Sequence, residues 1–149
     1  MALPRKSAEH REQVLAPDWQ IRELLKTSRR VALVGLDADE SSEAMVRARR
    51  LLAYDFELFP VHSTCSTLLG HACNEHLRDI RRDIDIVVLL PGAHETSALH
   101  VAHEAIQKHV RVFWFEDQDA DPDLVEMLTR AGVQVVANRS LEQEFAKLN

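Results

Sequence analysis

The strongest constraint in this sequence is a regular alternation of short apolar runs with longer amphipathic segments, which begins at residue 31. The apolar runs have the length of buried strands and cover residues 31–35, 56–61, 84–90, 110–115 and 133–137. The segments between them carry apolar residues at helical spacing and cover residues 42–53, 95–109, 122–131 and 141–148. Strands that alternate with helices pack into a parallel sheet with helices on both faces. The chain is therefore predicted to form a doubly wound α/β domain with five parallel strands in the order 3-2-1-4-5.

The chain before this alternation divides into an irregular segment and one helix. Residues 1–17 are polar and show no periodicity, so we expect an N-terminal arm there, followed by a single domain over residues 18–149. Asp18 is a suitable N-cap for a helix over residues 19–28. The apolar stripe of this helix is expected to consist of Trp19, Ile21, Leu24 and Leu25.

Composition and charge exclude several classes of protein. The 149 residues include 18 Lys and Arg against 24 Asp and Glu, a net charge of −6 at pH 7. Such a chain lacks the basic surface that nucleic acid requires. No apolar run is long enough for a membrane span, and the first residues lack the apolar core of a signal peptide. With only two cysteines, Cys65 and Cys73, we expect a reduced cytoplasmic protein; a homodimer is compatible with the sequence but not required by it.

The loops at the carboxyl ends of the strands are the candidate binding site, because ligands of open α/β sheets bind there, where the strand order reverses. The residues at these ends are Gly35, Leu36 and Asp37, then Pro60, Val61 and His62, then Leu90, Pro91 and Gly92, and finally Glu116 and Asp117. The first of these loops leads into a helix N-terminus. Unpaired N–H groups and a partial positive charge suit such an end to phosphate.

Seven short motifs lie in order along most of the chain. They are the first strand with its glycine (31–35), Pro60-Val61, Leu68-Leu69-Gly70 with Cys73, Leu77-Arg78-Asp79-Ile80, Trp114, Ala131-Gly132-Val133 and Asn138-Arg139-Ser140. In these motifs and their spacing, the chain from about Ile21 onward resembles the small single-domain CoA-binding proteins, which are related to the CoA-binding domain of succinyl-CoA synthetase. The resemblance implies a Rossmann-like fold and a non-catalytic protein that binds CoA or a nucleotide.

The resemblance also assigns positions to a CoA site. It implies a phosphate loop of Gly35, Leu36 and Asp37, an adenosine side of Pro60, Val61 and His62, and Leu90, Pro91 and Gly92 opposite them. We expect no catalytic or metal-binding residue. The chain has no Gly-x-Gly-x-x-Gly for a dinucleotide, and no nucleophile is paired with a base at the strand ends.

The first loop departs from the family pattern. The family's two serine positions hold Asp37 and Ala44, and no Lys or Arg occurs between residues 31 and 46. Two further departures change the charge: the family's third strand usually ends in Phe-Arg, where this chain has Leu89-Leu90-Pro91-Gly92, and a glutamine is replaced by Glu116. Because carboxylates repel phosphate, these changes weaken the expected binding of CoA.

Two interpretations of this acidic loop are open. Its carboxylates and serines are good N-terminal helix residues, so the loop could cap its own helix, or it could still cradle a phosphate. The alternative function is therefore a Rossmann-like scaffold that has lost CoA and acts through protein–protein contacts. An acidic cleft would favour the scaffold, whereas Arg29, Arg30 or Arg139 reaching the cleft would favour CoA.

Some histidines, cysteines and one tryptophan could bind a metal or a ligand, but an ordinary surface or core position is the preferred interpretation for each. Cys65, His71, Cys73 and His76 could be zinc ligands, but their spacing is not that of a standard finger. His100 and His103 share a helix face without a third ligand nearby in the sequence, so surface exposure is the preferred interpretation. Trp114 could stack on adenine, but alternation favours packing in the core, on the opposite face from Phe113 and Phe115.

Overall fold

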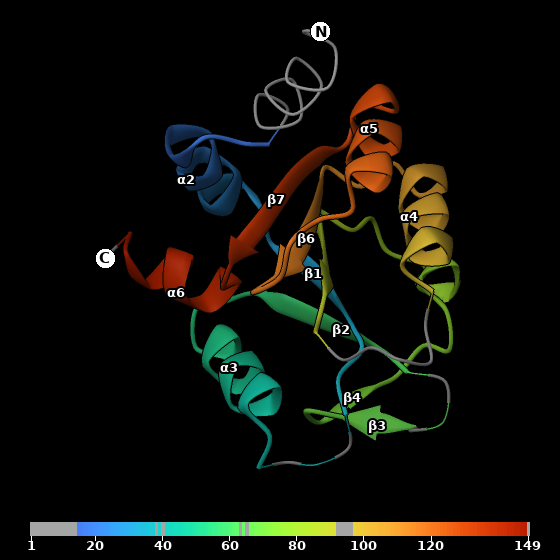
Figure 1. Cartoon of the computed structure of the whole chain (residues 1–149). Coiled ribbons are helices and arrows are strands. Elements are labelled where there is room, and N and C mark those ends of the chain that lie inside the picture. Colours follow the sequence, from blue (N-terminus) through green and yellow to red (C-terminus); the bar gives the residue numbers. More distant parts are fainter. Residues whose placement is uncertain are drawn as a thin grey trace, which may run out of the picture.

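The computed structural model describes residues 15–37, 39, 41–62, 64, 66–91 and 97–148. These residues form a parallel sheet of five strands in the order β2-β1-β5-β6-β7 (Figure 1). The strands are β1 (Arg30–Val34), β2 (Glu57–Val61), β5 (Ile86–Leu89), β6 (Val112–Glu116) and β7 (Gln134–Arg139). All five predicted strands are present, and the predicted Rossmann-like α/β fold is confirmed.

The predicted strand order, 3-2-1-4-5, is wrong. Numbered along the chain, the five strands of this sheet lie in the order 2-1-3-4-5. The third of them, β5, lies between β1 and β6, and all four of its residues are buried. The edge position belongs to β2, which contains Pro60. Because proline has no N–H to donate, it is confined to edge strands, and Pro60 therefore favours the observed order over the predicted one.

Helices cover both faces of the sheet and divide the core into two halves. On one face lie α2 (Asp18–Thr27), α3 (Glu43–Leu52) and α6 (Leu141–Ala146), and on the other α4 (Ala98–Gln107) and α5 (Pro122–Arg130) (Figure 1). Successive residues of a strand point to opposite faces. In β1, Ala32 and Val34 therefore pack with α4 and α5, whereas Val31 and Leu33 pack with α2, α3 and α6.

The N-terminal helix is present, but its predicted N-cap and stripe need correction. Asp18 is the first helical residue and follows Pro17, and its carboxylate forms an ion pair with Arg139 at 2.6 Å instead of capping the helix. Trp19 was expected in the apolar stripe but is 62% exposed. The buried positions are Ile21, Leu24 and Leu25. At about 100° per residue, Trp19 lies about 200° around the helix from Ile21, on the solvent side.

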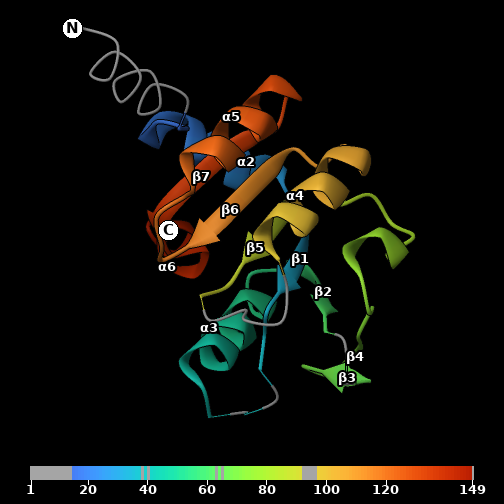
Figure 2. The same cartoon turned by 45° about the vertical axis from the view of Figure 1, so that its right-hand side comes forward.

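The end of the predicted arm and the long loop after β2 both contact the sheet. Leu15 lies beside Val135 of β7, and the N–H of Ala16 donates to the carbonyl of Val135 at 3.0 Å, so these two residues pack on the domain. After β2, a small hairpin of β3 (Thr67–Leu68) and β4 (His71–Ala72) lies near β2 (Figure 2), followed by the 3-10 helix η1 (Leu77–Asp79). None of the described helices is long and apolar enough to cross a membrane.

Candidate functional site

A cleft opens at the carboxyl edge of the sheet, at the point where the strand order reverses. The chain passes from β1 to β2 on one side and then crosses to β5 on the other, so the reversal lies between β1 and β5. The cleft has a volume of about 320 Å³. This volume is at the lower end of the range of small-molecule sites, roughly 300 to 1,000 Å³. We call it the switch-point cleft; its lining includes Leu36, Asp37, Glu43, Arg47, Leu90, Pro91, Glu116 and Asp117.

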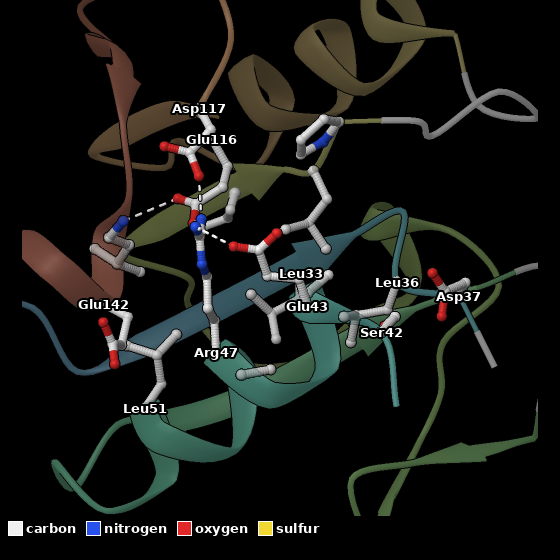
Figure 3. A pocket seen from close by; sticks show the side chains of 16 residues that line it. Leu33, Leu36, Asp37, Ser42, Glu43, Arg47, Leu51, Glu116, Asp117 and Glu142 are labelled. Carbon is white, nitrogen blue, oxygen red and sulfur yellow. Dashed lines mark hydrogen bonds and ion pairs between the residues drawn. The ribbon is translucent and has the colours of Figure 1, made fainter. Parts of the chain in front are cut away.

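The floor of the switch-point cleft is apolar because it is the end of the core between the sheet and α3. Leu33 of β1 and Leu51 of α3 contribute to it (Figure 3). Val88 of β5 is also part of the lining. Leu36 and Leu90, which follow β1 and β5, are also buried there. Such a floor suits the uncharged part of a ligand, and the charged walls decide which ligand is accepted.

One arginine, Arg47, extends from α3 into the cleft and is surrounded by carboxylates (Figure 3). Its guanidinium forms ion pairs with Asp117, with Glu43 at 2.6 Å and with Glu116 at 3.7 Å. Glu43 lies one helical turn before Arg47, so this pair could have been recognised from the i,i+4 spacing in the sequence. The contacts with Glu116 and Asp117 depend on tertiary structure, because those residues follow β6.

Glu116 is the most perturbed of these carboxylates. It is only 5% exposed, and its Oε1 accepts a hydrogen bond from the backbone N–H of Leu141 at 2.9 Å. Burial raises the pKa of Glu116 from 4.5 to about 7, with a further increase from Asp117. The Leu141 N–H, the charge of Arg47 and the Ser140 hydroxyl act in the opposite direction. The net charge of the cleft therefore changes near neutral pH.

The acidic loop caps itself. The carboxylate of Asp37 accepts from the N–H of Asp39 at 3.0 Å, and the carboxylate of Asp39 accepts from the N–H and hydroxyl of Ser41 at 2.9 and 2.6 Å. The Ser41 hydroxyl and N–H lower the pKa of Asp39. At the N-terminus of α3, the Ser42 hydroxyl accepts from the N–H of Met45 at 3.2 Å. This arrangement agrees with the interpretation of the loop as a helix cap.

None of the three arginines expected to supply a cation to the cleft contributes to its lining. Arg30 pairs with Glu57 at 3.3 Å, and Arg139 with Asp18 at 2.6 Å. Arg29 precedes β1 and lines a separate hollow near Tyr54, at the opposite end of the strands. In the described part of the chain, the cation that lines the cleft is Arg47, which the sequence analysis missed because it lies one residue beyond the loop and the first turn of α3.

The structure brings together some of the predicted site residues but not others. Leu36, Asp37, Leu90 and Pro91 line the switch-point cleft. Gly35 is not part of the lining; its φ is 98°, a conformation that glycine adopts at little cost. Pro60, Val61 and His62 lie at the end of the edge strand β2 and are not part of the lining. His62 contacts its own loop, accepting from the N–H of Thr64 at 3.0 Å. Gly92 lies outside the described residues.

Two other sequence-based interpretations can be assessed. Trp114 is fully buried, and its Nε1 donates to the carbonyl of Arg139 at 2.9 Å, which confirms the core interpretation. Phe113 and Phe115 pack on the opposite half of the core, as alternation predicts. Cys65 lies outside the described residues, and His71 and Cys73 do not join His76 in a group of potential metal ligands.

Comparison with known proteins agrees with the fold. The family described as CoA binding domain matches residues 29–146. The uncharacterized protein YneT of Bacillus subtilis is 29% identical over 129 residues, which cover 85% of this chain and 93% of that protein. A hypothetical protein from Pyrococcus horikoshii OT3 has 27% identity and a TM-score of 0.80, and Prb, a redesigned PH1109 protein, has 29% and 0.81. Both comparisons cover 89% of this chain and 92% of the other chain.

A domain of a much larger enzyme shares the same fold. The dinucleotide-forming acetyl-coenzyme A synthetase 1 of Ca. Korarchaeum cryptofilum matches with 20% identity and a TM-score of 0.63, over 79% of this chain and 27% of that one. This likeness concerns the fold alone. The match over residues 29–146, which include the whole sheet and the switch-point cleft, shows that the chain belongs to the CoA binding domain family.

Proposed function

We propose that this protein is a non-catalytic binding domain that keeps the fold and cleft of its family but does not hold the phosphates of CoA at neutral pH. It then acts as a scaffold, through contacts with other proteins. The observation that carries this proposal is the acidic loop. Its side chains already bond the N–H groups of Asp39 and Ser41 in the loop and of Met45 in the first turn of α3, and these groups are then not free to bind a phosphate.

The charge of the switch-point cleft supports the same conclusion. Among the residues that the structure describes, five carboxylates line it, those of Asp37, Glu43, Glu116, Asp117 and Glu142, against the single guanidinium of Arg47. Glu142 has its own partner, Arg50, at 3.3 Å. A like-charged pair 4 Å apart near a protein surface costs on the order of 4 kcal/mol before screening. CoA, with its diphosphate and 3′-phosphate, would meet several such pairs.

The absence of catalysis and a cytoplasmic location remain predictions from the sequence. Glu116 is the cleft carboxylate whose pKa lies near neutrality, which is the property of a general acid or base. Its two oxygens, however, face Leu141 and Arg47 of the protein itself, at 2.9 and 3.7 Å. We therefore assign Glu116 a structural role in the cleft wall.

The second candidate function is binding of CoA or a nucleotide in the switch-point cleft, which is what the resemblance to the family implies. One observation favours it: Arg47 reaches the cleft, and two of its three partners, Glu43 and Asp117, have exposed side chains that can turn away from it. A ligand phosphate could then replace them on the guanidinium. Leu36 and Asp37 would border this phosphate, with Leu90 and Pro91 opposite.

Calorimetric titration with CoA distinguishes the two functions, with acetyl-CoA, ATP and AMP as parallel ligands at pH 7.5. We expect no heat of binding from the wild-type protein at millimolar ligand. The variant Asp37→Ser/Glu43→Gln restores the hydroxyl usual in the family and frees Arg47 from one partner, and we expect it to bind CoA measurably. Asp83→Ser is the matched control, because it removes an exposed carboxylate before β5, at the other end of the strands.

Micromolar binding of CoA by the wild-type protein would overturn the scaffold proposal and establish the second candidate. The double variant should then bind CoA more tightly than the wild type, and Asp83→Ser should bind it equally well. Binding that is unchanged in the double variant would place the ligand outside the switch-point cleft.

A further inference from the structure

We propose that His76, His100 and Glu104 form a binding site for a divalent transition-metal ion of the zinc type, on the face of the sheet covered by α4. This site is separate from the switch-point cleft, and the proposal does not depend on the proposed function. It departs from the expectation of no metal site, which was based on spacing along the sequence.

The three side chains present their ligand atoms to one common point. One nitrogen of each imidazole and one carboxylate oxygen of Glu104 all lie within 4.8 Å of one another. His100 Nε2 lies 3.8 Å from Glu104 Oε1. The rings of His76 and His100 meet edge to face, with their centroids 6.2 Å apart. Among the described residues, no other group of three potential ligands comes this close.

Two elements hold these ligands in place. His100 and Glu104 are one turn apart on α4, so their side chains project from the same helix face. His76 immediately precedes η1, which packs against α4. The carboxylate of Asp79 accepts from the N–H of His76 at 3.2 Å and fixes the backbone at this position. The third ligand thus comes from a segment that the sequence places far from the helix.

Glu104 is the buried member of this group. The residue is only 4% exposed, and its two carboxylate oxygens have different partners. The backbone N–H of Arg78 lies 3.4 Å from Oε2, and the Arg78 guanidinium Nε lies 3.8 Å away on a half-exposed side chain. A buried carboxylate is costly unless it is paired or coordinates a metal. Arg78 pairs with Oε2, so Oε1, which lies 3.8 Å from His100 Nε2, is the oxygen placed to share a metal ion with the imidazoles.

The ligand set selects the type of metal. Two imidazole nitrogens and one carboxylate oxygen suit Zn²⁺ and Co²⁺, whereas Mg²⁺ and Ca²⁺ prefer oxygen ligands only. Ligand atoms bound at about 2.0 to 2.1 Å in a tetrahedron lie roughly 3.3 Å apart. The present spacing therefore requires an inward movement of about 1 Å, which rotation of two partly exposed imidazoles can provide. Three protein ligands leave a fourth position open to water or another ligand.

The neighbouring charged and imidazole groups do not form the same site. Glu75 lies 3.8 Å from His76 Nε2, but its side chain is exposed to solvent. His103, three residues after His100 on α4, is exposed and lines a shallow hollow towards α5 instead. His103 is therefore a matched control: it has the same side chain on the same helix but is not one of the three ligands.

The test is a titration of the chelator-treated full chain with Zn²⁺, followed by calorimetry, and with Co²⁺, followed by its visible absorption. We expect one ion per chain, and each of His76→Gln, His100→Gln and Glu104→Gln should weaken binding by at least about tenfold. His103→Gln should bind as the wild type does. Zn²⁺ should also raise the Tm of the wild type by a few degrees and leave that of His100→Gln unchanged.

Cysteines offer the competing explanation, and a variant excludes it. The double variant Cys65→Ser/Cys73→Ser should retain the ion and show the Co²⁺ spectrum of nitrogen and oxygen ligands. The proposal is overturned if the wild type binds no Zn²⁺ at millimolar concentration, if binding disappears in the double cysteine variant, or if it survives in His76→Gln and His100→Gln. Unfolding curves of all variants establish that they fold, which is expected because both imidazoles are partly exposed.

Discussion

Arg47 and Glu116 form an ion pair in the wall of the switch-point cleft, with Nη1 of the guanidinium 3.7 Å from Oε2 of the carboxylate (Figure 3). The first residue comes from α3 and the second from the end of β6. Their pairing joins the helix after the acidic loop to the far side of the cleft. It also makes the charge of the cleft depend on one buried carboxylate, and the first two predictions follow from this pair.

Replacement of Glu116 by glutamine is expected to stabilise the protein at alkaline pH. The pKa of Glu116 is raised from 4.5 to about 7 in the folded protein. The folded state therefore holds this proton more tightly than the unfolded chain, and the contribution of Glu116 to stability falls as the pH rises through this interval. This loss corresponds to about 3 kcal/mol, part of which Glu116→Gln should recover, giving a gain of about 1 to 3 kcal/mol at pH 8.

Urea unfolding at pH 8 and pH 5 measures this effect. At pH 5 the wild-type carboxyl is mostly protonated, so the two proteins should have nearly equal free energies of unfolding. A glutamine variant that is less stable than the wild type at pH 8 would show that the ion pair with Arg47 outweighs the cost of burial.

Removal of Arg47 is expected to destabilise the protein at alkaline pH, in contrast to the replacement of Glu116. Arg47→Met leaves the buried Glu116 and its neighbour Asp117 without their cation. Because Asp117 and Glu43 are solvent-screened, we expect a loss of about 1 to 3 kcal/mol at pH 8, well below that of a fully buried pair. At pH 5 the loss should be smaller, since Glu116 is then mostly neutral.

Arg130→Met is the control for this substitution. Arg130 forms one ion pair, with Glu126 on the exposed side of α5, at 2.7 Å. Its replacement should change the free energy of unfolding by less than about 0.5 kcal/mol. Equal losses in both variants would assign the effect to the general change of charge rather than to the cleft.

The serine that begins α3 is expected to stabilise the helix directly. Ser42→Ala removes the hydroxyl that accepts from the N–H of Met45, which should cost about 1 kcal/mol. Chemical unfolding measures this loss, and Ser66→Ala, at an exposed loop position, should change stability by less than about 0.5 kcal/mol. If Ser42→Ala is as stable as the wild type, the capping bond is not formed in solution.

The two tryptophans should differ in fluorescence and in their contribution to stability. Trp114 is fully buried and its Nε1 bonds the carbonyl of Arg139, so Trp114→Phe should cost about 1 to 3 kcal/mol. Trp19 is 62% exposed, and Trp19→Phe should be nearly neutral. In the wild type, acrylamide should quench the emission of Trp19 and leave a blue-shifted component from Trp114. Complete quenching of both would contradict the buried position of Trp114.

The sequence predicted the existence and type of the main elements because these follow from local periodicity. The run from Val31 to Val34 and the alternation around Trp114 each fix which residues face the core. The strand order did not follow from periodicity. It depends on which strands pair, and only Pro60, confined to an edge, carried local information about that choice.

The residues of the candidate sites also fall into two groups: those that the sequence places locally and those that only packing brings together. Leu36 and Asp37 could be placed at this cleft from the sequence, because their positions relative to β1 are fixed by the chain itself. Arg47 and Glu116 approach each other only when α3 packs beside the end of β6. His76 likewise meets His100 and Glu104 only through the packing of η1 against α4.

The sequence by itself thus determined the α/β class, the two-sided core and the acidic character of the first loop, because hydrophobic periodicity and residue type are properties of a few neighbouring residues. Tertiary structure alone decided the edge position of β2, the enclosure of Arg47 by carboxylates and the raised pKa of Glu116. These properties arise from burial and from contacts between segments distant in the chain. Both the desolvation of a charge and its Coulomb energy depend on where the folded protein places its partners.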